Sequence, residues 1–380
     1  MLTADTYHPS DLTQADIATW REICASNTAF ASPLMGPDFA LAVGAVRPDT
    51  RVTVFRWPGR TAGFLAYQLR PGSLARPIGA PLADYHGLVA RDGLLIDEAL
   101  VAAGLSAYRC SGLVDPNHAF RGEPIQDRDT YGIALNDGAD AYLEAIRAAS
   151  PKRFKNYRRL ESKLEREVGP VRVVAPDHDQ SAFDQLLVWK REQFARTGGH
   201  DFLHSTWTRD LLQGLFERRE GDFQGLMITL YAGDKLVGGQ FGIRLGSAYH
   251  PWIASTDPGF APWSPGQLFL LRAIGAMPAL GLDTYDLGPG HDHYKRPFTQ
   301  TVRQIGSGLV TSSSLAGRAK RASEQAWLLM GAQRGGTVER LRRRLEAIAT
   351  SELTLIDRTC LFGSALAART RQTGVESEAA

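Results

Sequence analysis

The stretch WSPGQLFLLRAIGAMPALGLDTYDLGPGHDHYKRPF, residues 263–298, guides the interpretation of the rest of the chain. Within it Leu268, Leu271 and Ile274 recur at helical spacing, which predicts an amphipathic helix. Pro278 then ends that helix, because proline cannot continue the backbone hydrogen bonding of a helix interior. The stretch therefore predicts a helix that is entered from a loop and is followed by a new element.

Pro265 and Gly266 suit the entry to this helix, where the first backbone N–H groups have no partner within the helix. Such a helix end attracts phosphate groups without needing a particular side chain. Residues 282–287 predict a short strand after the helix, and the glycine-proline-glycine run at 288–290 turns the chain again.

A run of titratable side chains follows this turn: His291, Asp292, His293, Tyr294 and Lys295. An anion-binding helix end beside a tyrosine suggests the transfer of a group from a phosphorylated carrier. Group transfer is therefore the first functional hypothesis.

The composition indicates a globular protein that is large enough for two domains. The chain has 380 residues, of which 43% are hydrophobic and 22% are charged, as in soluble globular proteins. Its formal net charge of +2 gives no overall attraction for nucleic acid or for a membrane. We therefore expect no DNA partner, and an anionic partner would have to bind a local basic patch.

The cysteines favour a reducing compartment. Cys24, Cys110 and Cys360 lie far apart and form no CxxC pair, which argues against a disulfide framework. The first residues, MLTADTYHPSDLTQ, lack the basic and apolar regions of a secretory signal, and no apolar run reaches membrane-spanning length. These features predict a cytoplasmic protein.

The first 149 residues predict a unit of mixed helices and strands. Strand-like runs at 51–57 and 61–69 flank the Pro-Gly-Arg turn at 58–60 and predict a hairpin. The other predictions in this unit are helices within 11–46, at 94–105 and at 139–149, strands near 107–114 and at 131–135, and a loop at 115–129.

A second unit is predicted to span residues 150–313. It begins with a basic helix, which is followed by a strand at 171–175 and by helices near 181–195 and 206–218. Strands at 225–231, 236–245 and 248–254 come next. The helix that begins near Gly266, the strand at 282–287 and a last strand at 302–310 complete the unit. The order resembles that of the first unit, which suggests two related α/β units. Residues 314–380 predict a basic helical tail, with 370–380 disordered.

In the order of its segments the chain resembles a known family, the GNAT N-acyltransferases. Within that family it resembles the FemAB-like, CelD-type (BioF2-like) branch of bacterial exopolysaccharide synthesis. The matching pieces, in order, are GAPLADYHGLV (79–89), KRFKNYRRLESKLEREVG (152–169), GDKLVGGQFGIRLG (233–246), WSPGQLFLLRAI (263–274) and DLGPGHDHYKRPF (286–298). The resemblance implies an α/β fold with a mixed α+β sheet, in which two tandem GNAT-like units share a cleft and a helical basic tail follows.

The chain departs from ordinary GNAT sequences in two places. The usual phosphate loop is reduced to Ser264-Pro265-Gly266-Gln267, which bears on the identity of the acyl donor. The chain also lacks the long helical arm that FemAB members using aminoacyl-tRNA carry between their halves. This second departure makes amino-acid transfer the less favoured variant.

The resemblance also implies roles for residues of the second unit. Tyr294, four residues before Phe298, occupies the position of the tyrosine that protonates the leaving thiolate, although it could simply anchor a loop. The strand near 249–255 would supply a backbone N–H to the thioester carbonyl. Asp286 could bind or deprotonate the acceptor amine, or form the turn that follows it. The implied acyl-CoA (acetyl-CoA) contacts are Ser264, Gly266, Gln267 and Lys295.

A second polar cluster lies in the first unit. Asp84, Tyr85 and His86 interrupt an apolar stretch and precede a glycine, which suggests a loop that faces the cleft and holds the acceptor. His86 has an ordinary pKa suited to a base near neutrality. A hydrogen-bonded structural corner explains the same residues equally well.

Further substrate contacts are predicted at His291, His293 and Arg296. The His-x-His pair has no third, distant ligand and is a weak zinc signal, so we predict no metal site there. A general base or a substrate contact is the favoured functional interpretation of the two histidines. Loop polarity and a solvated basic face are the alternative interpretations of these residues.

Arginine pairs recur in the tail, at Arg318 and Arg321 and again at Arg340 and Arg344. Their spacing resembles cyclic-di-GMP contacts of some relatives in holdfast or adhesin systems, although an arginine-rich helix produces it by chance. The basic helix at 152–166 could likewise attract sugar nucleotides, lipid pyrophosphates or tRNA, or be a solvated face.

The sequence therefore predicts an N-acyltransferase that acetylates an amino sugar or its nucleotide- or lipid-linked precursor in exopolysaccharide, capsule or holdfast-type adhesin synthesis. It is expected to associate peripherally with a polysaccharide synthesis complex. The alternatives are aminoacyl transfer from aminoacyl-tRNA, and a non-catalytic effector that responds to cyclic-di-GMP.

Overall fold

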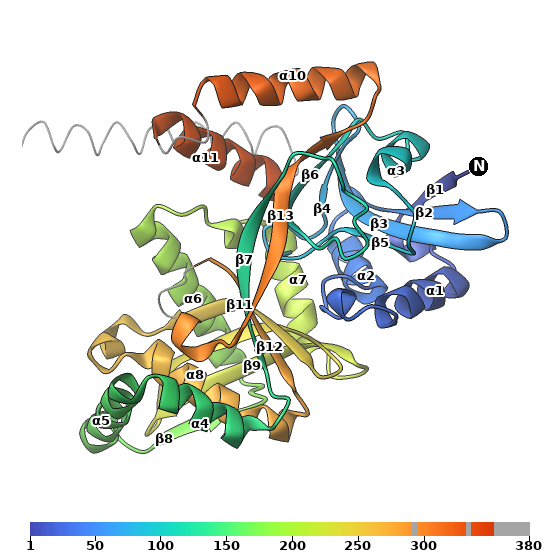
Figure 1. The fold of residues 1–380 in the computed structure, drawn as a ribbon. Helices are drawn as coiled ribbons and strands as arrows, with labels where there is room; N and C mark the ends of the chain where they lie inside the picture. Colours follow the sequence, from blue (N-terminus) through green and yellow to red (C-terminus); the bar gives the residue numbers. More distant parts are fainter. Residues whose placement is uncertain (291–294, 332–335, 353–380) are drawn as a thin grey trace, which may run out of the picture.

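The computed structural model describes residues 1–290, 295–331 and 336–352. One mixed sheet of 13 strands runs through the whole molecule (Figure 1). The predictions made for His291, His293 and Tyr294, and for disorder at 370–380, lie outside the described residues.

The first half supplies one end of this sheet. Its elements are β1 (Thr3–Tyr7), α1 (Gln14–Ala25), α2 (Pro37–Val46), β2 (Thr50–Trp57), β3 (Arg60–Arg70), β4 (Leu74–Pro77), β5 (Leu88–Ala90), α3 (Ile96–Ala102), β6 (Ala107–Leu113) and β7 (Ile125–Ala134). Strand β7 begins inside the stretch for which the sequence predicted a loop. The residues of β7 from 126 to 129 are polar and exposed, so they lack the apolar alternation that signals a strand.

The second half supplies the other end. Its elements are α4 (Ala139–Ala149), α5 (Pro151–Glu167), β8 (Val171–Val174), α6 (Gln180–Thr197), α7 (Thr206–Glu217), β9 (Phe223–Ala232), β10 (Lys235–Leu245), β11 (Ala248–Thr256), α8 (Pro265–Ala276), β12 (Thr284–Pro289) and β13 (Thr301–Thr311). Two helices complete the described chain, α10 (Leu315–Leu329) and α11 (Thr337–Ser351).

The two halves repeat one arrangement of strands and then exchange their last strands. In each half a meander is followed by a helix and a parallel strand: β4 pairs with β6, and β11 with β12. Strand β7 follows β6 in the chain but pairs with β12, whereas β13 follows β12 but pairs with β6. Because β7 and β13 also pair with each other, from Thr301↔Gly132 to Gly308↔Ile125, the two sheets become one.

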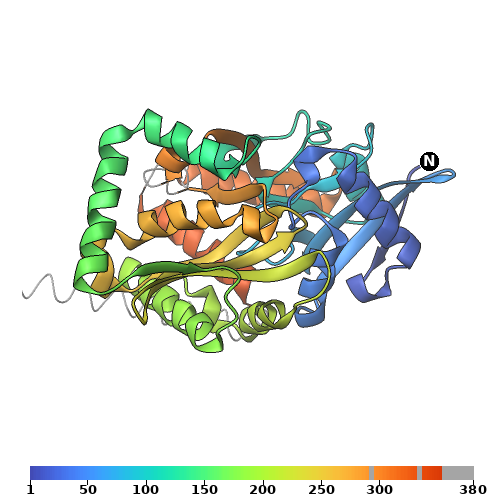
Figure 2. The same ribbon diagram turned by 90° about the horizontal axis from the view of Figure 1, so that it is seen from below.

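Helices cover both faces of the second half's sheet (Figure 2). Helices α6 and α7 pack on one face, and their core continues into α1 and α2 of the first half. Helices α4, α5 and α8 pack on the other face around a separate core. No helix among the described residues is both long enough and apolar enough to cross a membrane.

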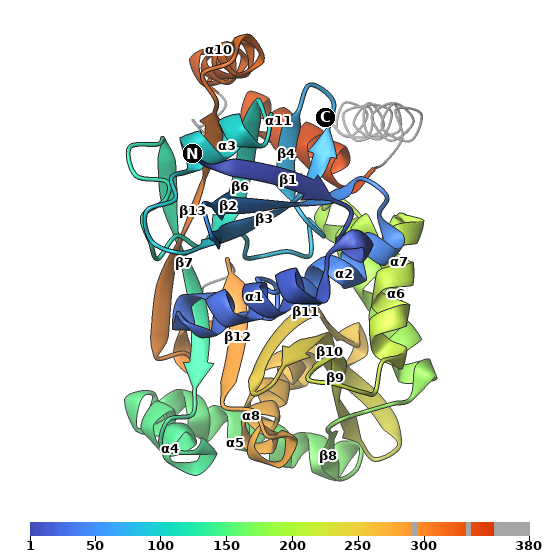
Figure 3. The same ribbon diagram turned by 90° about the vertical axis from the view of Figure 1, so that its right-hand side faces the viewer.

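The last described helices fold back onto the first half (Figure 3). Glu324 of α10 pairs with Arg109 of β6, and Glu346 of α11 pairs with Arg76 of β4. The end of α11 also reaches the second half, where the Trp207 indole N–H donates to the Ser351 carbonyl at 2.8 Å. The tail is therefore joined to both halves.

A close backbone approach inside the first half gives a stability test. A Cβ atom on Gly112 of β6 would lie 1.8 Å from the Asp84 carbonyl oxygen, whereas a Cβ on Gly214 of α7 would meet nothing within 4 Å. We expect Gly112→Ala to lower the free energy of unfolding by about 2–3 kcal/mol, as overpacking does. Gly214→Ala should raise it by roughly 0.5–1 kcal/mol, because alanine is the better helix former.

Urea unfolding of both variants at neutral pH measures these changes. Equal stability of Gly112→Ala and the natural protein would show that the loop carrying Asp84 does not lie against β6.

Candidate functional site

The parallel strands β11 and β12 pair over only two residues before they separate. The pairs are Ala248↔Thr284 and Tyr249↔Tyr285. On its other edge β11 pairs with β10, and the register of that pairing shifts next to Gly242, which pairs with Pro251. Pro251 directly follows His250 in the chain. Such shifts bend a strand away from its neighbour. The residues that follow the last pair, His250 and Asp286, therefore stand where the two strands diverge.

Asp286 is held at this point by donors from both halves. Its Oδ1 accepts the Tyr85 hydroxyl at 2.6 Å and the Gly288 N–H at 2.8 Å, and its Oδ2 accepts an Arg303 N–H at 2.7 Å. The residue is only 5% exposed. Tyr85 and Asp286 were both predicted from the sequence as site residues. They are 201 positions apart in the chain, and this contact brings them together.

Tyr85 acts as a hydrogen-bond donor in this cluster. Burial, reinforced by the charge of Asp286, raises the pKa of the Tyr85 phenol far above its ordinary value. The hydroxyl also lies against the Thr130 hydroxyl of β7. Tyr85 is therefore protonated throughout the physiological pH range and fixes the position of Asp286.

His250, which the sequence analysis did not single out, lies between two carboxylates. Its ring is fully buried, with Nε2 3.1 Å from Asp84 Oδ2 and Nδ1 3.8 Å from Asp286 Oδ1. Nδ1 has no hydrogen-bond partner among the described residues. A neutral imidazole that donates from Nε2 to Asp84 keeps a free lone pair on Nδ1, the arrangement of a proton acceptor.

Asp84 reaches His250 because its loop is fixed to β6. The His86 N–H donates to the Gly112 carbonyl at 3.0 Å, and the Val114 N–H donates to the His86 carbonyl at 2.9 Å. On the other side Gly288 has φ +68°, and a Cβ there would lie 2.8 Å from Asp84 Oδ2. The loop of the first half and the turn after β12 therefore fit closely together.

His86, predicted as a base, points into β6 instead. Its Nε2 accepts the backbone N–H groups of Ser111 at 3.0 Å and Gly112 at 3.1 Å. Burial lowers the pKa of His86 to about 3, so the ring is neutral. These contacts give His86 a structural role, whereas the imidazole that lies beside Asp286 is that of His250.

Lys295, predicted to contact the cofactor, is buried at the end of β12. Its Nζ donates to the carbonyls of Leu287, Gly288 and Pro289, at 2.5, 3.2 and 3.1 Å. The amine therefore holds the last three residues of β12 in place. Arg296 follows it at an exposed position.

The predicted carrier contacts lie at the entry to α8, with Ser264 just before the helix and Gly266 and Gln267 in its first turn. Ser264 has φ 53°, and its carbonyl accepts the Gln267 N–H at 3.1 Å. Three prolines, at 258, 262 and 265, supply no N–H, and Asp257 takes the Gly259 N–H at 2.7 Å. This loop therefore offers few free donors and a nearby negative charge, which fits a pyrophosphate poorly.

Two cavities open beside the polar cluster. One, of about 890 Å³, lies between α1–α2 and the start of β11 and β12, and Asp286 and Arg303 line it. The other, of about 1250 Å³, runs from Asp84 and Gly290 to the place where β4 and β6 separate. His250 thus links a carboxylate of one cavity to a carboxylate of the other.

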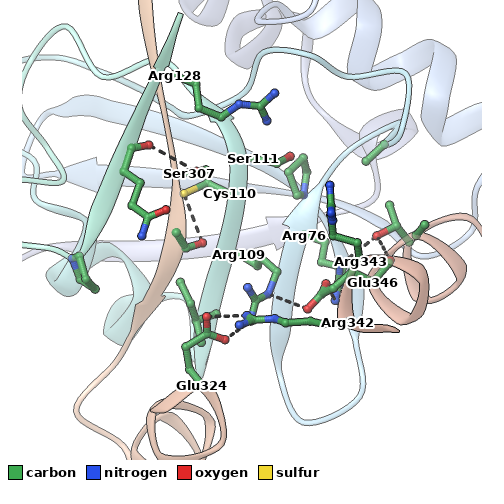
Figure 4. Close-up of a pocket in the computed structure, with 18 of the residues that line it drawn as sticks. Arg76, Arg109, Cys110, Ser111, Arg128, Ser307, Glu324, Arg342, Arg343 and Glu346 are labelled. Carbon is green, nitrogen blue, oxygen red and sulfur yellow. Dashed lines mark hydrogen bonds and ion pairs between the residues drawn. The ribbon is translucent and has the colours of Figure 1, made fainter. Parts of the chain in front are cut away.

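Arginines and glutamates line the larger cavity (Figure 4). Glu324 lies between Arg109 and Arg342, with N···O distances of 2.6 and 2.5 Å. Arg128 also lines the cavity and forms no ion pair with a described residue. The described residues contain no group of three or more His, Cys, Asp or Glu arranged to hold a metal ion.

Known proteins are similar to this chain in sequence over one segment and in fold over most of its length. Residues 151–296 match the family model of the acetyltransferase (GNAT) domain. The crystal structure of FemX is 11% identical, with a TM-score of 0.50, over 80% of this chain and 96% of that one. A tandem GNAT protein from the clavulanic acid biosynthesis pathway is 11% identical, with a TM-score of 0.45, over 83% and 99%. No curated protein matches the sequence.

The match to FemX shows a shared fold, and the prediction of a mixed α/β fold with a large mixed sheet is confirmed. Residues 151–296, most of the second half, are similar to the GNAT domain. The domain boundary at residue 150 and the roles of individual site residues stay predictions.

The pKa of His86 leads to a pH-dependent stability test. The folded protein keeps this ring neutral down to about pH 3, whereas an unfolded histidine binds a proton below about pH 6.5. Stability due to His86 is therefore complete above pH 6.5 and falls as the pH drops toward 3, by at most about 1.4 kcal/mol per pH unit. His86→Gln keeps an acceptor for the two N–H groups but cannot bind the proton.

Urea unfolding between pH 7 and pH 4 should show a smaller acid-induced loss of stability in His86→Gln than in the natural protein. Parallel pH profiles for the two proteins would contradict the buried, neutral state of His86.

Proposed function

We propose that the protein is an N-acyltransferase whose reaction takes place where β11 and β12 separate. The observation that carries the proposal is the placement of His250 and Asp286 at this separation, inside the domain that matches the GNAT model. Acyl transfer from a thioester needs a base for the amine, a donor for the carbonyl oxygen and a proton for the thiolate.

The acceptor amine enters the smaller cavity as an ammonium group and binds the Asp286 carboxylate. His250 accepts a proton of the amine at Nδ1, and Asp84 stabilises the imidazolium through Nε2. The neutral amine nitrogen then attacks the thioester carbon, a C–N bond forms, and the C–S bond breaks. The leaving thiolate takes a proton from the donor that the sequence predicts at Tyr294, and the new amide nitrogen gives its surplus proton back to that donor. The proton held by His250 passes to solvent.

We propose acetyl-CoA or another acyl-CoA as the donor. Strand β11, free of β12 beyond Tyr249, has backbone N–H groups for the thioester carbonyl. Ser264, Gly266 and Gln267 would contact the carrier. Since their loop offers a pyrophosphate few donors, most of the donor's binding energy would come from its pantetheine arm and acyl group.

The proposed acceptor is an amino sugar, or its nucleotide- or lipid-linked precursor, in the synthesis of exopolysaccharide, capsule or a holdfast-type adhesin. The smaller cavity, of about 890 Å³, supports an acceptor of this size, and Arg218 lines it together with Asp286 and Arg303. An arginine guanidinium is suited to a phosphate group of such a precursor. A peripheral association with a polysaccharide synthesis complex belongs to the same proposal.

A second candidate is aminoacyl transfer from aminoacyl-tRNA. The proline-rich loop before α8 favours it, since that loop suits a CoA pyrophosphate poorly. Helix α5 also exposes basic residues that a tRNA could contact: Lys152, Arg153, Lys155, Arg158, Arg159 and Arg166. Transfer assays with purified protein, in which acyl-CoA and aminoacyl-tRNA are offered with the same amino sugar, separate the two donors.

A third candidate is a non-catalytic effector that binds cyclic-di-GMP through its tail. Two tail arginines are already paired within the chain, Arg342 with Glu324 and Arg343 with Glu339. Calorimetry with cyclic-di-GMP tests it on the full chain and on an Arg318→Ala/Arg321→Ala variant. Binding that is unaffected by these changes would remove Arg318 and Arg321 as contacts.

The proton acceptor can be tested by substitution. We expect His250→Gln to lower kcat roughly 10²–10⁴-fold, the range for loss of a general base, with little change in the KM of the donor. Asp286→Asn should also lower kcat and raise the KM of the acceptor, because it removes the charge that binds the ammonium group. Acyl transfer to an amino sugar, followed by release of free thiol, measures both constants.

His178→Gln is the matched control, because His178 is exposed and outside the cluster. Tyr294→Phe completes the series and should lower kcat. Full activity of both His250→Gln and Asp286→Asn, with folding intact, would exclude the proposed reaction centre.

A further inference from the structure

Helix α10 presents its apolar side to solvent. Figures 1 and 3 show it along the outer edge of the molecule. Leu315 is 83% exposed and Leu329 is 85% exposed, and Ala319, Ala322 and Ala326 between them are also exposed. A helix on a globular protein normally buries its apolar stripe. The stripe of α10 therefore lacks a cover among the described residues.

The polar side of α10 is the side that contacts the molecule. Arg321 donates to the Thr311 hydroxyl at 2.9 Å, and Glu324 pairs with Arg109 and Arg342. A Cβ on Gly317 would lie 2.2 Å from the Ser312 carbonyl oxygen, so the start of the helix lies tightly against the chain. These contacts fix the rotation of the helix and keep its apolar side outward.

The spacing of the stripe indicates that another helix covers it. Leu315, Ala319, Ala322, Ala326 and Leu329 follow one another by four, three, four and three residues. This alternation is the 3.5-residue repeat of a coiled-coil seam. Alanines at its centre allow two helices to approach closely. A membrane surface is a poorer fit, because helices that bind bilayers present bulky apolar residues along the buried side.

The stripe is also nearly symmetric about its middle. Leu315 lies seven residues before Ala322 and Leu329 lies seven after it, while Ala319 and Ala326 lie three before and four after. Two copies of the helix in antiparallel orientation would therefore place leucine against leucine and alanine against alanine. A two-fold dimer requires such a self-complementary surface.

The residues beside the stripe fit the same arrangement. Arg318 and Gln325 lie on one flank, so in an antiparallel pair Arg318 of one copy would face Gln325 of the other. The two Arg318 side chains would be about 12 Å apart along the helix axis, at the 1.5 Å rise of an α-helix. The flank thus offers hydrogen bonds and places no like charges together.

We propose that α10 is a self-association surface, through which two copies of the chain pair by antiparallel contact of their Leu315–Leu329 helices about an axis near Ala322. A pair of helices this short is smaller than a standard interface of ~1,600 Å². The dimer is therefore weak and forms with a dissociation constant in the micromolar range. The proposal is independent of the proposed reaction.

Sedimentation velocity of the full chain tests the surface, at concentrations from about 1 to about 100 µM, around the affinity expected for a small interface. The natural protein should shift from monomer toward dimer across this range. Leu329→Glu should stay monomeric. Val188→Glu should behave as the natural protein, because Val188 is an exposed apolar residue of α6, away from the stripe. A monomeric natural protein, or a dimer unaffected by Leu329→Glu, would overturn the proposal.

The antiparallel orientation has its own test. Gln325→Glu should strengthen the dimer several-fold at low salt by pairing with Arg318 of the second copy, and this gain should vanish at high salt. Gln325→Lys should weaken it. A weaker or unchanged dimer in Gln325→Glu contradicts the proposed orientation. Flotation of a monomer with phosphatidylglycerol vesicles that is lost in Leu329→Glu would assign the stripe to a membrane and overturn the proposal.

Discussion

The pairing of β7 with β13 is the constraint on which the rest of the structure depends. Each strand leaves the half in which its chain neighbours lie and joins the other, so main-chain hydrogen bonds connect the two sheets continuously. The exchange fixes the relative position of the halves more firmly than surface contacts would, since backbone ladders are directional. It also brings the first half's polar loop against the separation of β11 and β12.

The cluster at this separation is built from both halves. Tyr85 and Asp84 come from the first half, and His250 and Asp286 come from the second. Arg303 on the exchanged strand β13 completes the contacts of Asp286. Removing charges from water costs several kcal/mol each, so a buried carboxylate needs such partners. The site is therefore as sensitive to the arrangement of the halves as to its own residues.

The sequence predicted the order of elements well where apolar periodicity is local, as in α7, α8 and the β9–β11 meander. It missed the exchange of β7 and β13, because strand pairing between distant segments leaves no local signal. In the site, Asp84, Tyr85 and Asp286 were all named, and the structure brings them together.

His250 was missed because a histidine within an apolar strand resembles a core residue, while His86, in a polar run, looked functional. The available signal for His250 was its position as the one histidine of the predicted strand 248–254. The outward side of α10 could not be predicted either. Its rotation depends on the ion pairs of Glu324 with Arg109 and Arg342, which lie far apart in the sequence.

We propose that the separation of β11 and β12, and not the matching separation of β4 and β6, holds the reacting carbonyl. A crystal structure with a hydrolysis-resistant acyl-CoA analogue tests this proposal. We expect the analogue's carbonyl to lie against the β11 backbone beyond Tyr249, within reach of Asp286 and His250. A carbonyl bound between β4 and β6, beside Arg109, would contradict it.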